Sequence, residues 1–309
     1  MMNTKIIRVT QKPAPFKRQL PLHLMLLPSV LVLLIYSYYP MVGILIGFEN
    51  FNPRIGFFGS EWTGLQNLLY VMKMPNFTSV LYNTVFIATM KIVASLAVPI
   101  LYAILLDQIR NSKIKRSIQT ALYIPNFLSW VILSGILIDI LSPSTGIMAD
   151  IFKALNAEPV FFLAEPELFP YLLVITDTWK GAGYGSIVYL AAITSIDPAL
   201  YEAAIIDGAS RTQQIFHITI PGMSTIIVLM ATLSLGNVLN AGFDQVLNLY
   251  SPVVYSTGDI IDTFVYRIGM VNSQYGIATA AGLFKSLVSL VLISTGYYLA
   301  RVTANYTIF

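Results

Sequence analysis

The sequence predicts an all-α integral membrane protein with six transmembrane helices. Of its 309 residues, 56% are hydrophobic and only 11% are charged, and the mean hydropathy is +0.71. Soluble domains carry about 25% charged residues, so this composition excludes an ordinary soluble fold. A helix needs about 20 mostly apolar residues to cross roughly 30 Å of hydrocarbon. Six stretches meet that requirement, at residues 22–48, 83–106, 118–141, 169–195, 222–243 and 278–301.

The charge and the cysteine content exclude several other classes of protein. Eighteen Lys and Arg against fifteen Asp and Glu give a net charge of +3, too weak an excess for an electrostatic grip on nucleic acid. The chain has no Cys, and its two His, His23 and His217, are far apart in sequence. We therefore expect no disulfide framework, no metal site and no catalytic residue.

The basic residues before the first span and in the loops predict the orientation of the chain in the membrane. Five basic residues precede it, but at 27 residues it is too long for a signal peptide and no small-residue cleavage pattern follows. Counted over the loops, eleven Lys and Arg share the side of the N-terminal tail and four lie on the other side. The positive-inside rule then places both termini in the cytoplasm. We expect one domain over 1–309, with a cytoplasmic tail at 1–21 and a cytoplasmic segment at 196–221.

Residues 196–221 carry the signals of two short helices joined by a glycine turn. Asp197 is a good N-cap, Pro198 suits the first helical position, and Gly208 can take the left-handed conformation that ends a helix. Ser210 and Gln213 form a capping box for the second helix, which we expect Pro221 to close. Local patterning alone fits an ordinary amphipathic connector equally well.

A resemblance gives this segment a function. The run Glu202-Ala203-Ala204, followed by Gly208, Ile218 and Pro221, resembles the EAA loop of permease subunits in binding-protein-dependent ABC importers. The flanking residues are similar to the carbohydrate-uptake branch that includes the maltose permeases. Further segments resemble the permeases for polysaccharide fragments and complex oligosaccharides, at residues 40–43, 48–51, 123–127, 243–250 and 259–263.

The resemblance implies that the two short helices are coupling helices that insert into a separate ATPase subunit. Glu202 would pair with a basic group of the ATPase, Ala203 and Ala204 would pack in its cleft, and Gly208 would set the angle between the helices. We assign the neighbouring Asp207 and Arg211 to the same ATPase-coupling set. ATP and Mg²⁺ would be bound by the ATPase, because no G-x-x-x-x-G-K-[ST] loop occurs in this chain.

Several polar residues fall inside the predicted spans, where a charge is costly and usually faces a bundle interior or water. At 1.5 Å per residue, Lys91, Asp177, Lys180 and Lys285 lie roughly 10 to 16 Å below the outer boundary. Three lysines against one aspartate give this layer a charge of +2, which suits an acidic substrate such as a uronate-containing oligosaccharide. The predicted substrate path consists of Lys91, Trp130, Asp177, Lys180, Asn237, Asn240 and Lys285.

Each of these residues also has a structural interpretation. Asp177 and Lys180 are three apart on one helix and can pair with each other. Lys91 and Lys285 can extend along the helix to the outer interface. Asn237 and Asn240 can bond neighbouring helices, and Trp130 can simply pack.

The leading hypothesis is a subunit of a type I ABC importer for oligosaccharides in the bacterial cytoplasmic membrane. Its partners would be a second homologous permease, two ATPase subunits, and an extracytoplasmic solute-binding protein that meets the outer loops. One alternative is an ion-coupled secondary transporter that uses Lys91, Asp177 and Lys180 as coupling groups, although no repeated halves with matching breaks are visible. A membrane enzyme is a second alternative, and the absence of a metal or nucleophile constellation gives it little support.

Overall fold

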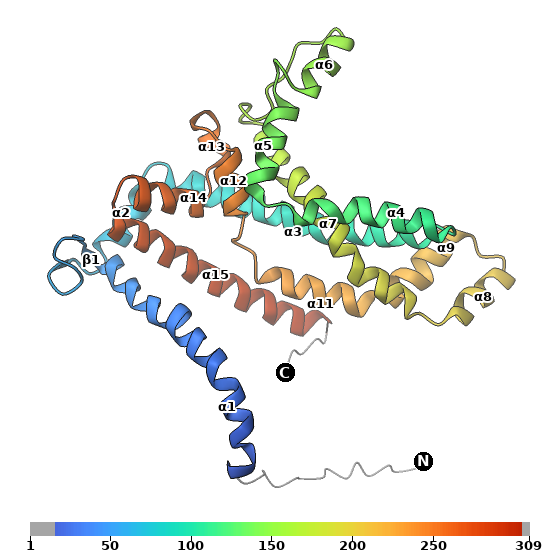
Figure 1. Cartoon of the computed structure of the whole chain (residues 1–309), viewed down its shortest axis with the longest axis horizontal. Coiled ribbons are helices and arrows are strands. Elements are labelled where there is room, and N and C mark those ends of the chain that lie inside the picture. Colours follow the sequence, from blue (N-terminus) through green and yellow to red (C-terminus); the bar gives the residue numbers. More distant parts are fainter. Residues whose placement is uncertain (1–15, 305–309) are drawn as a thin grey trace.

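The computed structural model describes residues 16–304, with side chains described from residue 20 to residue 298. Helices run along the long axis, between a small hairpin at one end and the short helices α8 and α9 at the other (Figure 1). The elements are α1 (Phe16–Leu33), η1 (Leu34–Tyr38), η2 (Tyr39–Phe48), β1 (Glu49–Asn50), β2 (Glu61–Trp62), α2 (Gln66–Lys73), α3 (Phe77–Asp107), α4 (Ser112–Tyr123), η3 (Ile124–Phe127), α5 (Trp130–Leu141), α6 (Ile147–Ala154), α7 (Phe169–Thr194), α8 (Pro198–Ile206), α9 (Arg211–Gln214), η4 (Ile215–Thr219), α10 (Ile220–Gly222), α11 (Ser224–Leu235), α12 (Phe243–Leu249), η5 (Pro252–Val254), α13 (Tyr255–Gly258), α14 (Ile261–Tyr266), η6 (Arg267–Val271) and α15 (Tyr275–Ala304).

Three continuous helices within the described range are long and apolar enough to cross a membrane: Leu20–Phe48, Phe77–Asp107 and Tyr275–Tyr298. Three further pairs of helices pass the same test together, but each is bent at a short break. The count of six spans therefore holds when each bent pair is one span.

The predicted span at 118–141 is not one helix. Leu128 adopts an extended conformation, and the side chain of Ser129 caps α5 by accepting a hydrogen bond from the backbone N–H of Ile132. The helical run Ser112–Phe127 and the run Trp130–Leu141 consequently meet at 107°. Figure 1 shows the result, because α5 and α6 project away from the bundle that contains α4.

The predicted span at 222–243 is also shorter than expected. The helix α11 ends at Leu235, and a non-helical segment leads to Gly242, whose φ of +90° is in the left-handed region. Pro221 does not close the preceding helix, because helical structure continues through it to Gly222. The bend of 60° comes between Gly222 and Ser224 instead.

The centre of the bundle is the contact between α3 and α7, and three apolar clusters surround it. Close packing is visible at Gly183 of α7, where a Cβ atom would lie 2.0 Å from the carbonyl oxygen of Leu122. Gly183 therefore lets α4 approach α7 closely, which is a common use of glycine between membrane helices. The clusters centre on Leu133 and Leu173, on Phe77 and Phe264, and on Tyr189 and Met223.

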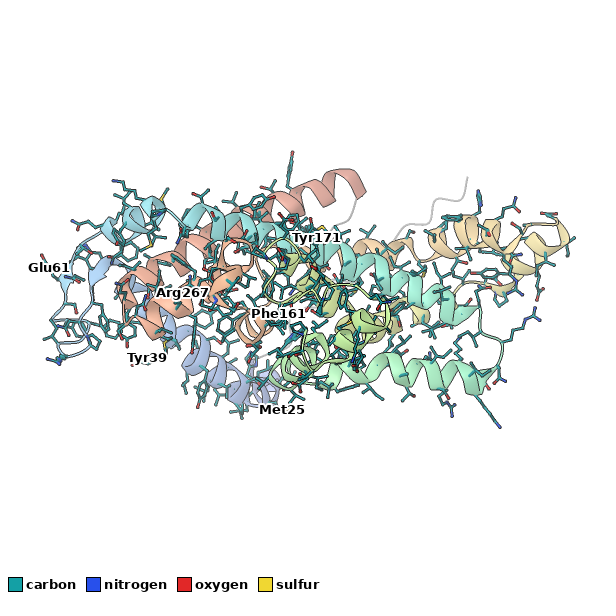
Figure 2. All side chains as sticks on the ribbon, turned by 90° about the horizontal axis from the view of Figure 1, so that it is seen from above. Met25, Tyr39, Glu61, Phe161, Tyr171 and Arg267 are labelled. Atoms are coloured by element: carbon teal, nitrogen blue, oxygen red, sulfur yellow. The ribbon has the colours of Figure 1, made fainter. Side chains whose placement is uncertain are left out.

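The helix α1 stands apart from this bundle. Only 6% of the most apolar 18-residue window of Leu20–Phe48 is buried, and Met25 is 76% exposed (Figure 2). An apolar helix surface this large is unstable in water and requires lipid or another protein around it.

The end of the molecule away from α8 and α9 carries the hairpin, α2 and the segment from α12 to η6, which we call the cap. Glu61 of β2 lies at the extreme of the long axis, at the end opposite α8 and α9 (Figures 1 and 2). In the cap, Arg267 forms an ion pair with Asp259 and lies 4.4 Å from the ring centroid of Tyr255. Asn83 of α3 donates hydrogen bonds of 3.0 and 3.2 Å to the carbonyl oxygens of Ser256 and Asp259, which anchors the cap to the bundle.

Candidate functional site

Residues 196–221, which we call the coupling segment after the role that the resemblance implies, begin with the conformation that their sequence predicts. The Asp197 carboxylate caps α8 by accepting a 2.9 Å hydrogen bond from the backbone N–H of Ala199. Gly208 ends the helix with a φ of +77°. The N–H of Gly208 donates to the carbonyl of Ile205 at 3.1 Å, and that of Ala209 donates to the carbonyl of Ala204 at 2.8 Å. This pair of bonds is a Schellman motif, which fixes the direction in which the chain leaves α8.

The second half begins with the predicted capping box. The Ser210 hydroxyl accepts from the N–H of Gln213 at 3.3 Å, and the Gln213 side chain accepts from the N–H of Ser210 at 2.7 Å. Arg211 donates a 3.3 Å hydrogen bond to Gln108 beyond the end of α3. The Arg211 side chain therefore contacts the bundle of its own chain in addition to its predicted role in binding the ATPase.

The coupling segment presents an open surface. Glu202, Ala203, Asp207 and Gly208 are exposed and Ala204 is half-buried. Behind them, a cavity of about 450 Å³ lies between the ends of α3 and α7 and the helices α8 and α9. Large apolar side chains of the same segment are also exposed, and these were absent from the predicted set: Leu200 (53%), Ile205 (63%), Ile206 (86%) and Phe216 (62%). Exposed apolar residues gathered beside charged ones are typical of a protein-binding surface.

Lys91 lies inside the bundle instead of extending to the interface. It is 7% exposed, and its Nζ donates to the carbonyl of Ala241 at 2.7 Å and to the side chain of Gln245. Asp177 pairs with Lys91 at 3.7 Å, and it forms no ion pair with Lys180, which was the structural alternative for these two residues. Gln245 in turn donates to Thr176 at 2.7 Å. This buried network joins α3, α7 and α12, and Gln245 was not among the predicted path residues.

Lys180 has different surroundings. Its Nζ donates to the carbonyl of Asn126 at 3.0 Å and lies 5.6 Å from the ring centroid of Trp130. Two exposed aromatic residues adjoin it, Phe127 (74%) and Tyr184 (50%), whose rings meet edge to face at 6.0 Å. Within residues 16–304, no carboxylate lies within ion-pair distance of Lys180. The structure thus brings Lys180 and Trp130 together and adds two aromatic residues that the sequence analysis missed.

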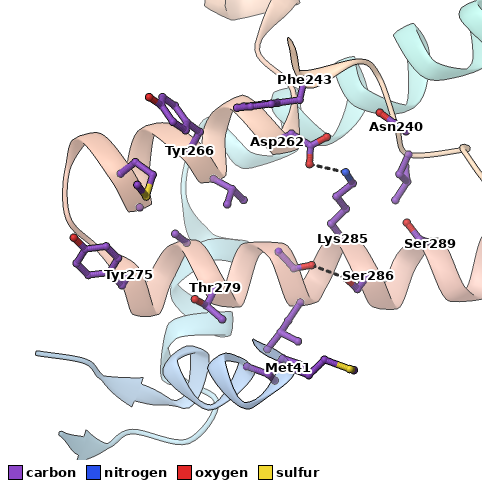
Figure 3. A pocket seen from close by; sticks show the side chains of 18 of the residues that line it. Met41, Asn240, Phe243, Asp262, Tyr266, Tyr275, Thr279, Lys285, Ser286 and Ser289 are labelled. Atoms are coloured by element: carbon purple, nitrogen blue, oxygen red, sulfur yellow. Dashed lines mark hydrogen bonds and ion pairs between the residues drawn. The ribbon is translucent and has the colours of Figure 1, made fainter. Parts of the chain in front are cut away.

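Lys285 lines a large pocket of about 1100 Å³ between α14, α15, η2 and the segment after α11 (Figure 3). Its Nζ pairs with Asp262 at 2.5 Å, and the two side chains are 22% and 25% exposed. Phe243, Tyr266 and Tyr275 face the same space (Figure 3). The Asp262 partner was not predicted, and it reduces the formal charge of the polar layer from +2 to +1, with three lysines against two aspartates.

Asn237 and Asn240 lie between the pocket of Lys285 and the surroundings of Lys91. Both line the large pocket, and both also line a cavity of about 290 Å³ that contains Lys91 and Asp177. The break after α11 positions them there, since a continuous helix to residue 243 would turn their side chains elsewhere. The predicted substrate path therefore divides into two parts. Lys180 and Trp130, with Phe127 and Tyr184, form what we call the Lys180 cluster, and the remaining predicted residues line two neighbouring cavities.

Comparison with known protein families identifies the family of this chain. Residues 100–304 match the model described as "Binding-protein-dependent transport system inner membrane component". That match covers the coupling segment and four of the six membrane segments. The chain belongs to this family.

Members of this transport family are membrane components of ABC importers, so the chain is a multi-pass membrane protein. One similar relative is the polygalacturonan/rhamnogalacturonan transport system permease YteP of Bacillus subtilis, 38% identical over 91% of this chain and 87% of its own length. A chain from the crystal structure of a bacterial ABC transporter "involved in the import of the acidic polysaccharide alginate" has a TM-score of 0.85 at 36% identity. It covers 93% of this chain and 97% of its own.

A second structure shows a bacterial alginate ABC transporter in complex with a periplasmic protein that holds an alginate pentasaccharide. Its chain has a TM-score of 0.84 at 35% identity, and it covers 93% of this chain and 96% of its own. These findings confirm the predicted family, the helical membrane fold and the importer class. They give no support to the ion-coupled alternative.

Proposed function

We propose that this chain is a transmembrane subunit of an ATP-driven importer that moves acidic oligosaccharides across the bacterial cytoplasmic membrane. Its family, and relatives named for alginate and for polygalacturonan, support the oligosaccharide class. The observation that carries the acidic class is Lys180, the lysine of the polar layer that lacks a carboxylate partner in the described residues.

Lys180 and the rings beside it offer what a uronate sugar needs. The ammonium group can pair with the sugar carboxylate, and hydrogen bonds of this charged kind contribute about 1.5 to 3 kcal/mol. Trp130 and Tyr184 offer aromatic faces against the C–H surface of the sugar ring. The carbonyl of Asn126 fixes the Nζ position at 3.0 Å before the substrate arrives, which reduces the entropy lost on binding.

Lys91 and Lys285 have another role in this proposal. Each already faces an aspartate, at 3.7 Å for Asp177 and 2.5 Å for Asp262. An incoming carboxylate would have to displace that partner, so we assign sugar hydroxyl groups to Lys285 at the pocket wall and a structural role to the buried Lys91. Asn237 and Asn240, which line both cavities, supply amide groups that can bond the hydroxyl groups of the sugar.

Transport requires partners, which we assign from the family. The coupling segment would dock on an ATPase subunit through Glu202, Ala203 and the exposed Ile206, with Asp207 and Gly208 at the turn. A second permease would complete the path, two ATPase subunits would hold ATP and Mg²⁺, and a binding protein would deliver the sugar to the outer cap. Both termini would lie in the cytoplasm.

The decisive experiment measures uptake by the complete importer in proteoliposomes. Oligogalacturonides and uncharged galacto-oligosaccharides of equal length are compared in Lys180→Gln, in Lys180→Arg and in the control Lys73→Gln, which removes an exposed lysine of α2. We expect Lys180→Gln to lower uptake of the acidic sugar about tenfold or more, the equivalent of losing one charged hydrogen bond. Lys180→Arg and the control should retain most of it.

Two results would contradict the proposal at different levels. Equal losses for acidic and uncharged sugars in Lys180→Gln would remove the acidic class and leave the importer class standing. Transport by the isolated chain down an ion gradient, without nucleotide or any partner, would overturn the importer class itself.

A further inference from the structure

One face of α4 and η3 is exposed along its whole length. It consists of Lys113, Arg116, Thr120, Ile124 and Phe127, which we call the α4 ridge. All five residues are exposed, Ile124 by 55% and Phe127 by 74%. Their spacing of three and four residues places them on one side of a helix. The opposite side packs on α7, where Gly183 meets the backbone of Leu122.

The ridge is polar over most of its length. Thr120 donates to the carbonyl of Arg116 at 2.9 Å, so its hydroxyl is satisfied within the helix. Lys113 and Arg116 have no carboxylate within ion-pair distance in the described part of the chain. A surface with two unpaired cations and a hydroxyl is suited to water more than to hydrocarbon.

The ridge ends at the Lys180 cluster. Asn126, the residue before Phe127, accepts the hydrogen bond from Lys180, and Phe127 meets Tyr184 of α7 edge to face. From residue 113 to residue 123, α4 rises about 15 Å at 1.5 Å per residue, and η3 continues it to Phe127. Lys180 of α7 therefore lies at the Phe127 end of the ridge, and Arg116 and Lys113 follow along α4 toward its other end.

We propose that the α4 ridge lines a water-filled exit from Lys180 to the cytoplasm, and that Lys113 and Arg116 make this exit favour anionic solutes. The inference rests on the proposed function and adds to it the route after the binding cluster. A groove lined by charges of one sign raises the local concentration of the opposite ion and its rate of arrival. An acidic oligosaccharide released from Lys180 would be retained on this path, where an uncharged one would not.

The absence of Cys in the chain allows a direct test. Thr120→Cys is assembled with Cys-free partners into nanodiscs, and its reaction with an anionic and a cationic methanethiosulfonate is timed. We expect reaction with both reagents, and about tenfold faster reaction with the anionic one relative to a free thiol. Val32→Cys, on the apolar surface of Leu20–Phe48, is the control and should react with neither.

The charge claim is tested in the same background. Lys113→Gln with Arg116→Gln should abolish the anionic preference of Thr120→Cys and leave the cationic reagent no slower than before. Lys153→Gln, which removes a lysine of α6, should leave the preference unchanged.

Each contrary outcome has a distinct meaning. If Thr120→Cys reacts with neither reagent, lipid or a partner protein covers the ridge and the exit route is wrong. If the preference survives in the double variant, the two cations do not set the field and the charge claim is wrong. Neither readout requires sugar transport, so failure here is distinguishable from failure of the Lys180 experiment.

Discussion

The lysines inside the membrane segments differ by what each one faces. Lys91 is buried against Gln245, a backbone carbonyl and Asp177, whereas Lys285 pairs with Asp262 at the wall of an open pocket. Lys180 faces a carbonyl and an aromatic ring. Burial with several partners is typical of a structural group, and partial exposure without a counter-charge is typical of a ligand-binding one.

This distinction predicts the effect of Lys91→Met on stability. The substitution leaves the carbonyl of Ala241 and the side chain of Gln245 without their donor, and each buried unsatisfied group costs about 1 to 3 kcal/mol. We expect a lower thermal unfolding midpoint for the purified complex. Lys73→Met, the same change at an exposed position of α2, should leave the midpoint nearly unchanged. An unaltered midpoint in Lys91→Met would mean that the network is not structural.

At the residue scale, the sequence could indicate which membrane residues are polar but not what they contact. Depth along the helices placed Lys91, Asp177 and Lys285 in one layer, and the structure does place them around adjoining cavities. Their partners come from elsewhere in the chain: Gln245 is 154 positions from Lys91, and Asp262 is 23 from Lys285. Such pairings depend on the tertiary arrangement, which local pattern does not encode.

At the scale of the elements, the turn between α8 and α9 gives a second prediction. Gly208 has a φ of +77°, and a side chain there meets nothing within 4 Å, so the cost of substitution comes from the backbone alone. A β-branched residue in this conformation costs about 1 to 2 kcal/mol or more, whereas Asn tolerates it. We expect Gly208→Val to uncouple ATP hydrolysis from uptake while the complex still assembles, and Gly208→Asn to behave nearly normally.

Uptake and ATPase activity of reconstituted complexes, with copurification of the subunits, are the measurements for Gly208. Normal transport by Gly208→Val would show that this turn is not the joint between the bundle and the ATPase.

Two glycines of α7 give a matched pair of substitutions that tests the close contact between α4 and α7. A Cβ at Gly183 would lie 2.0 Å from the Leu122 carbonyl oxygen, whereas one at Gly181 would meet nothing within 4 Å. Gly183→Ala should force α4 away from α7 and lower the unfolding midpoint, at a cost of about 1 to 3 kcal/mol. Gly181→Ala should keep or raise it, because Ala is the better helix former by about 1 kcal/mol. Equal midpoints for the two variants would contradict the close contact.

Helix ends were predictable where side chains cap them, and helix breaks inside apolar stretches were not. Asp197, Gly208 and Ser210 act within a few residues, so their roles could be deduced from order alone. The break at Leu128 was hidden because apolar residues continue on both sides of it. Its signal was present in Pro125 followed by Ser129, a potential N-cap, but hydropathy over a span-length window averages such local signals away.

At the scale of the whole molecule, the proposed path is not enclosed by this chain alone. The Lys180 cluster and the α4 ridge are open on one side, and α1 leaves the bundle with its apolar surface uncovered. The exposed coupling segment is at the opposite end of the long axis from the cap (Figure 1). Force applied to α8 can reach the Lys180 cluster through α7, which carries Lys180 and Tyr184 and leads directly into α8 at a 70° bend.

The direction of transport depends on which end of this axis faces the cytoplasm. The excess of basic residues on the side of α4, α8 and α9 predicts that this end is inside. Single cysteines at the two ends test it, since the chain has none of its own. Arg54→Cys in the hairpin loop should react with a membrane-impermeant maleimide in intact spheroplasts, and Ser112→Cys at the start of α4 should react only in inverted vesicles. The reverse pattern would place the coupling segment outside, beyond the reach of cytoplasmic ATP, and an importer driven by that segment would then be excluded.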